Sequence, residues 1–168
     1  MPAAHMRSVP RSSTSVVDLT PEHEAGHAIV GAYYECWITR IEWRGPGDGE
    51  TKFFEQAPTE AWLRIAIAGD LARDGLDVPL DQWHGLHYGD DLIIVEKCLR
   101  RLAGRGKRAQ AELQRAATEE VRQVLLDHRE AHRNLAALIR ERRVLVNIWP
   151  QRRLLLEAAA RGELGACR

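Results

Sequence analysis

The five residues His23–Glu24–Ala25–Gly26–His27 constrain this chain more than any other feature of its sequence. On an α-helix, two histidines four residues apart lie on one face with their Cβ atoms ~5–6 Å apart. Their imidazole nitrogens can therefore bind one Zn²⁺ at ~2.0–2.1 Å. Glu24 faces the space beside the metal, where it can take a proton from a metal-activated water. The pattern predicts a zinc-binding helix that carries its own general base, as in metallopeptidases with the H-E-x-x-H motif.

The residues around this motif predict a helix from Pro21 to about Cys36. Thr20 is a favourable N-cap residue, and proline is favoured at the first helical position. Apolar residues recur at helical spacing through the segment. Gly26 lies in the helix interior, where glycine costs about 1 kcal/mol relative to alanine. We therefore expect another segment of the chain to approach closely at Gly26.

Two histidines do not complete a catalytic zinc site, which needs a third protein ligand and an open position for water. A metzincin-type third histidine is missing, because no histidine follows His27 before His84. The remaining candidates are two glutamates and a cluster in the segment 84–92: Glu60, Glu96, His84, His87, Asp90 and Asp91. These residues alone leave the third ligand open.

The sequence resembles the peptidase domain of FtsH, the ATP-dependent zinc metalloprotease, over roughly residues 18–160. The resemblance is carried by the zinc signature, a β-hairpin, an Ala-Gly helix and an Asp-Asp-Leu segment: His23–Val30, Ile38–Trp43 with Glu50–Phe54, Ile67–Ala72, and Gly89–Leu92. It implies that Asp91 is the third zinc ligand and that Asp90 stands at the family's asparagine. Asp70 occupies a position where the family usually has arginine.

The resemblance also implies the fold class and the domain organisation. We expect a mainly α (α+β) fold of zincin-like type, a helical peptidase domain with a small β-hairpin and a long C-terminal amphipathic helix. The expected divisions are a flexible arm at residues 1–17, the zinc metallopeptidase domain at 18–162 and a short tail at 163–168. The length of 168 residues favours one domain.

Turn signals and hydrophobic periodicity predict the individual elements. In chain order we expect strands at Ile38–Trp43 and Thr51–Glu55 around a turn at Gly45–Gly49, a helix from Thr59 to Asp74–Gly75, a helix from Asp91 to about Leu102, one long helix over Ala109–Arg143, and a short helix after Pro150. Because a two-stranded hairpin is marginally stable alone, it must pack on the helices.

Two features of FtsH proteins are missing from this sequence. There is no G-x-x-x-x-G-K-[ST] phosphate loop, and no apolar run reaches the ~18–20 residues that a membrane span requires. Residues 1–17 lack the apolar region of a secretory signal. We therefore expect a free-standing peptidase domain that uses no nucleotide and does not cross a membrane.

Composition narrows the expected partners and compartment. Lys+Arg and Asp+Glu both number 24, so no excess of charge favours nucleic acid as a partner. The three cysteines are odd in number and form no C-x-x-C pair, which fits a reducing compartment better than a disulfide framework. These features predict a cytoplasmic protein.

We expect a zinc metalloendopeptidase that hydrolyses unfolded or flexible polypeptide segments without ATP. His23, His27 and Asp91 would hold Zn²⁺, and Glu24 would act as general base. An extended substrate could add to the strand Thr51–Glu55 as a further strand. Three aspartates are candidates for orienting a ligand histidine through its second ring nitrogen: Asp74, Asp77 and Asp81.

Two alternatives stay open at this point. One is a non-catalytic zinc-binding interaction module, although a structural site needs no general base such as Glu24. The other is a regulatory H-E-x-x-H peptidase that cleaves a transcriptional repressor, with a glutamate in place of Asp91 as the third ligand. A homo-oligomer, and a separate ATPase or regulator as partner, are compatible with the sequence.

Overall fold

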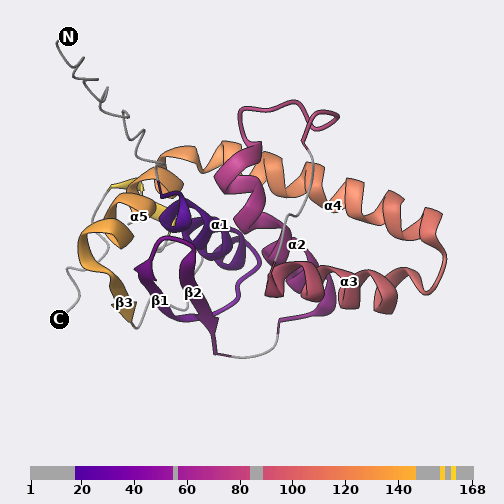
Figure 1. The fold of residues 1–168 in the computed structure, drawn as a ribbon, viewed down its shortest axis with the longest axis horizontal. Coiled ribbons are helices and arrows are strands. Elements are labelled where there is room, and N and C mark those ends of the chain that lie inside the picture. The colour runs from indigo at the N-terminus through magenta and orange to yellow at the C-terminus, as the bar shows by residue number, and fades with distance from the viewer. Residues whose placement is uncertain (1–17, 55–56, 84–88, 147–155, 158–159, 162–168) are drawn as a thin grey trace, which may run out of the picture.

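The computed structural model describes residues 18–54, 57–83, 89–146, 156–157 and 160–161. These residues form a mainly helical fold with a small three-stranded antiparallel sheet (Figure 1). The elements in chain order are α1 (Thr20–Tyr33), β1 (Ile38–Gly45), β2 (Asp48–Phe53), α2 (Thr59–Asp70), the π-helical turn η1 (Leu71–Gly75), α3 (Asp90–Ala103), α4 (Lys107–Asp127), α5 (Arg129–Arg142) and β3 (Val144–Val146).

The helix α1 lies at the centre of the fold, between the sheet and the other helices (Figure 1). Its residues Ala25, Ala28, Ile29 and Val30 are fully buried. A Cβ atom at Gly26 would lie 2.5 Å from Ala72 Cβ and 2.7 Å from the backbone oxygen of Ala68. The close approach predicted from Gly26 is therefore confirmed, and the approaching segment is α2 with η1.

The ends of α1 differ from the prediction. Thr20 is the first helical residue and not the N-cap, and its hydroxyl and backbone N–H both donate to Asp18 Oδ1, at 2.6 and 3.0 Å. The helix ends at Tyr33, short of the predicted Cys36. Glu35 has a φ of 60°, a conformation that an α-helix cannot continue through.

The sheet has the strand order β2-β1-β3, so β2 and β3 are its edges. β1 and β2 form the predicted hairpin, with Ile41 opposite Thr51. The turn is tighter than the expected Gly45–Gly49, because β1 extends to Gly45 and β2 already begins at Asp48. On the other side of β1, Ile41 lies opposite Leu145 of β3. The sequence did not indicate β3, because three residues are too few to show an alternating pattern.

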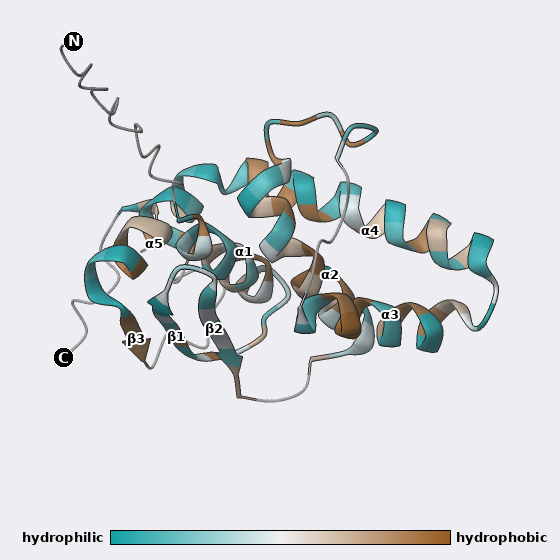
Figure 2. Ribbon diagram, viewed as in Figure 1, coloured by the Kyte–Doolittle hydropathy of each residue, from teal (hydrophilic) through white to brown (hydrophobic). Residues whose placement is uncertain are grey.

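The single helix predicted over Ala109–Arg143 is wrong, because the chain breaks at His128 into α4 and α5. Hydrophobic spacing continues through the break and does not reveal it. Figure 2 shows hydrophobic and hydrophilic residues alternating along α4. After the break, α5 packs mainly on α1, where His132 Nε2 donates to the backbone oxygen of Glu22 at 2.9 Å and Leu135 and Ile139 are buried.

The helices that flank the site follow the prediction closely. α3 begins one residue before the expected Asp91 and ends one residue after Leu102. α2 begins at Thr59, and η1 continues it to the expected end at Gly75. The segments 1–17 and 163–168 lie outside the described residues. So does most of the segment after Pro150, where a short helix was expected. Within the described part of the chain, no helix combines the length and apolarity needed to cross a bilayer.

Candidate metal centre

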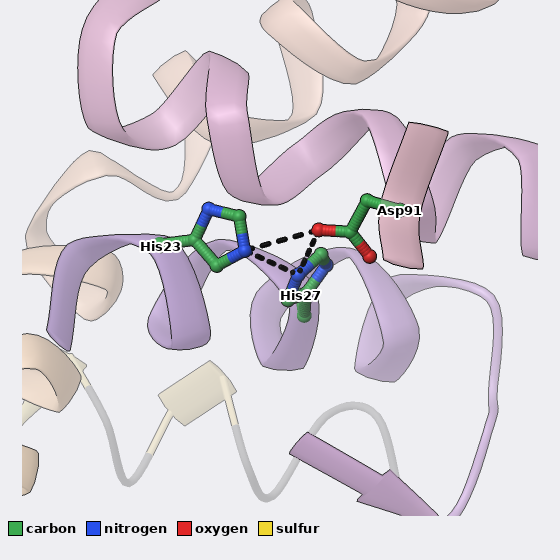
Figure 3. Close-up of side chains that lie close together, drawn as sticks. All are labelled: His23, His27 and Asp91. Atoms are coloured by element: carbon green, nitrogen blue, oxygen red, sulfur yellow. Dashed lines mark hydrogen bonds and ion pairs between the residues drawn. The ribbon is translucent and has the colours of Figure 1, made fainter. Parts of the chain in front are cut away.

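Three side chains from α1 and α3 converge on one point (Figure 3). Asp91 Oδ2 lies 3.0 Å from His23 Nε2 and 3.2 Å from His27 Nε2. The two Nε2 atoms are themselves 3.0 Å apart. Each residue thus presents one donor atom to a shared centre, and we call these three residues the His-His-Asp triad.

The packing of α2 and the turn before α3 bring these residues together. A Cβ atom at Gly69 would lie 2.5 Å from His23 Cε1 and 2.6 Å from His27 Cε1, so α2 passes directly against both imidazoles. Gly89 precedes α3 with a φ of 101°, which favours glycine. This turn leads into α3, whose first turn carries Asp91.

The second ring nitrogen of each histidine faces a group that orients the ring. His27 Nδ1 lies 2.7 Å from the backbone oxygen of Ile65, which can only accept, so Nδ1 carries a proton and the neutral ring offers the lone pair of Nε2 to a metal. His23 Nδ1 is buried and lies 3.5 Å from Asp70 Oδ1, a distance too long for a good hydrogen bond. Such partners typically orient metal-binding histidines.

Asp70 faces His23, although the sequence did not indicate it as a candidate for orienting a ligand histidine. It is 2 % exposed and also lies 3.1 Å from Arg73 Nη2. The expected candidates do not take this place: Asp74 pairs with Arg73, Asp77 pairs with Arg129, and Asp81 is exposed. A usable signal was present, because Asp70 is a lone carboxylate at the end of an apolar helical run.

The electrostatics of the site favour a cation among these side chains. Burial lowers the pKa of His23, but Asp70, Asp91 and Glu24 outweigh it and raise that pKa to about 9. The pKa of His27 is also raised: burial opposes the shift, and Asp91 is the main cause of it. Burial raises the pKa of Asp91, but the two histidines lower it by more than burial raises it. The net effect is a pKa below the usual value for aspartate. The site therefore stabilises positive charge beside Asp91.

The donor set fits a zinc ion. Two imidazole nitrogens and one carboxylate oxygen are ligands that zinc accepts, and three protein ligands are what catalytic zinc sites use. Bonds of ~2.0–2.1 Å in tetrahedral geometry place donor atoms about 3.3 Å apart. The observed separations of 3.0–3.2 Å are close to this value. The triad would fill three of the four positions around a tetrahedral ion and leave the fourth for another ligand.

Glu24 lies next to the triad but is not one of its members. Its side chain is buried, and Oε2 accepts a hydrogen bond of 2.7 Å from Thr51 Oγ1 of β2. A Cβ atom at Gly49 of the same strand would lie 2.5 Å from Glu24 Oε1. The edge strand β2 therefore packs directly against this carboxylate.

A cavity of about 460 Å³ opens over the triad and Glu24. β2 lines it with Gly49, Thr51 and Phe53, and α2 lines it with Trp62 and Ile65. The rings of Phe53 and Trp62 meet edge to face, with their centroids 5.3 Å apart. The cavity thus joins a polar centre to an apolar wall, beside a strand that is at the edge of the sheet among the described residues.

Among the described residues, the other candidates for the third ligand are not part of the triad. Glu60 and Glu96 are exposed. Asp90 is exposed and lines the cavity but contributes no atom to the converging group. His84 and His87 lie outside the described residues. Within the described ranges, Asp91 is the carboxylate that meets both histidines.

Comparison with known proteins adds no further constraint. No protein-family model matches the chain, and a search of curated proteins finds no significant match. The case for function therefore rests on the residues and their geometry.

Proposed function

We propose that this chain is a zinc metalloendopeptidase with a zincin-like, FtsH-type peptidase domain. The observation that carries the proposal is the His-His-Asp triad with the buried carboxylate of Glu24 beside it and outside it. A structural zinc site normally closes its fourth position with Cys or His and needs no neighbouring base. A triad with an adjacent carboxylate that is not one of its ligands instead matches what hydrolysis requires.

Zn²⁺, when bound by His23, His27 and Asp91, supplies Lewis acidity that polarises a carbonyl and lowers the pKa of water. The hydrogen bond to the Ile65 carbonyl keeps the His27 imidazole turned with Nε2 toward the centre, and the Asp70 carboxylate faces Nδ1 of His23 from 3.5 Å. Glu24 accepts the proton of the attacking water and then delivers it to the leaving amine, so it acts first as base and then as acid.

The surroundings of the site suit a peptide in extended conformation. β2 is an edge strand that lines the cavity, and an extended peptide can add to such an edge through main-chain hydrogen bonds. A peptide bound in this way must expose its backbone over several residues. We therefore propose unfolded chains, flexible loops and termini as substrates.

The test measures metal content and cleavage on the same purified protein. Anomalous scattering at the zinc edge identifies the metal and its ligands in crystals. Cleavage of an unstructured reporter such as casein is followed with and without a chelator, and the matched control is Glu24→Gln. Zinc on His23, His27 and Asp91 with chelator-sensitive cleavage supports the proposal. Bound zinc without cleavage of any flexible substrate would instead favour the non-catalytic interaction module.

A further inference from the structure

We infer that Thr51 is a positioning residue for the general base, and this inference rests on the proposed function. Its hydroxyl holds Oε2 of the Glu24 carboxylate and so fixes the orientation in which this group accepts the proton of the attacking water. The observation behind it is the 2.7 Å hydrogen bond from Thr51 Oγ1 to Glu24 Oε2, which joins the edge strand β2 to the helix α1.

This hydrogen bond has the length of a strong, charge-assisted bond. Bonds from a hydroxyl to a carboxylate are typically ~2.5–2.7 Å long. The hydroxyl also lies 3.2 Å from the backbone oxygen of Glu24, but it has one proton, and the carboxylate is both nearer and charged. Glu24 is 3 % exposed, so a protein donor to its carboxylate is important for its hydrogen bonding. Thr51 therefore contributes directly to where this carboxylate points.

A second residue of β2, on the same face of the strand, limits the other oxygen of the carboxylate. Residues i and i+2 of a strand face the same way, and Gly49 accordingly faces Glu24 together with Thr51. A Cβ atom at Gly49 would lie 2.5 Å from Oε1 and 2.8 Å from Cγ of Glu24. Gly49 leaves room for Oε1 while Thr51 donates to Oε2, so the two carboxylate oxygens have different surroundings.

The loss of the hydroxyl should slow turnover without weakening substrate binding. Misplacing a catalytic group by about 1 Å can reduce the rate by ~10²-fold. We expect Thr51→Val, which keeps the shape of the side chain, to lower kcat by about 10–100-fold with KM little changed. Thr51→Ser keeps the hydroxyl and should retain most of the turnover, whereas Thr51→Ala should resemble Thr51→Val.

A double-mutant cycle with Glu24→Gln separates this role from a purely structural one. If Thr51 acts through Glu24, Thr51→Val should cause no further loss of kcat in the Glu24→Gln background, because residues that act as a unit are non-additive. A full additional loss in that background would overturn the inference. The inference would also be overturned if Thr51→Val had the kcat of the wild type while Thr51→Ser had the kcat of Thr51→Ala. The methyl group, and not the hydroxyl, would then matter.

Crystal structures supply a readout that does not depend on activity. In Thr51→Val the Glu24 carboxylate should rotate away from its wild-type position or occupy several positions, and in Thr51→Ser it should not. An unmoved carboxylate in Thr51→Val overturns the inference even if the wild-type protein fails to cleave any reporter. Absence of cleavage by zinc-loaded wild-type protein, by contrast, counts against the proposed function.

Discussion

Replacing Gly69 with alanine should remove most of the zinc affinity of this protein. Gly69 lies in α2 where that helix meets both imidazoles of the triad. Helix propensity alone predicts the opposite sign, because alanine in a helix interior is about 1 kcal/mol more favourable than glycine. In Gly69→Ala, the higher helix propensity of alanine is therefore opposed by the steric conflict of its Cβ atom with the two imidazoles.

The size of the effect follows from the distances at Gly69. The new Cβ atom would lie 2.5 Å from His23 Cε1, 2.6 Å from His23 Nε2 and 2.6 Å from His27 Cε1. Ordinary contacts of a Cβ atom begin at 3.4 Å, so the rings must move by about 0.9 Å or the helices must separate. Zinc sites hold their donor distances to within about 0.2 Å. We expect zinc affinity to fall by at least ~100-fold, more than the loss of an outer hydrogen-bond partner causes.

The assay is zinc competition against a chromophoric chelator, combined with thermal unfolding with and without zinc. Zinc that binds the native state raises the stability of wild-type protein by linkage, and Gly69→Ala should show little of this rise. Gly45→Ala is the matched control, because nothing lies within 4 Å of a Cβ atom there. Wild-type zinc affinity in Gly69→Ala would refute the reasoning, since the imidazoles could not then occupy the positions described.

Three further predictions address the ligands, the general base and the substrate. Asp91→Ala should weaken zinc binding and abolish cleavage, whereas Asp90→Ala should do much less; the reverse order, measured by zinc stoichiometry and turnover, would contradict the assignment of the third ligand. Glu24→Gln should keep zinc and the fold but lose about 10²–10⁴-fold in turnover of casein, and unchanged turnover would exclude Glu24 as the base. The purified chain should cleave a destabilised reporter domain and spare its stable folded form, whether ATP is present or not, because global unfolding costs about 5–15 kcal/mol; efficient ATP-stimulated cleavage of the stable form would count against this prediction.

The sequence by itself determined the parts of the molecule that local patterns encode. The spacing of His23 and His27 places both on one helical face, and Gly26 indicated the close approach that α2 makes there. Turn residues located the hairpin, and the periodicity of apolar residues located α2 and α3. The resemblance to FtsH proteins pointed to Asp91, a residue that local pattern alone could not distinguish from its neighbours in the segment 84–92.

The tertiary structure decided what depends on contacts between distant segments. The Ile65 carbonyl and the Asp70 carboxylate face the histidines because α2 crosses α1 at Gly69. Thr51 meets Glu24 because the edge strand packs on the same helix. Such contacts leave no periodicity in the sequence, because each joins single residues that lie far apart along the chain. The break at His128 is likewise unmarked in the sequence, because the apolar spacing runs on unchanged from α4 into α5.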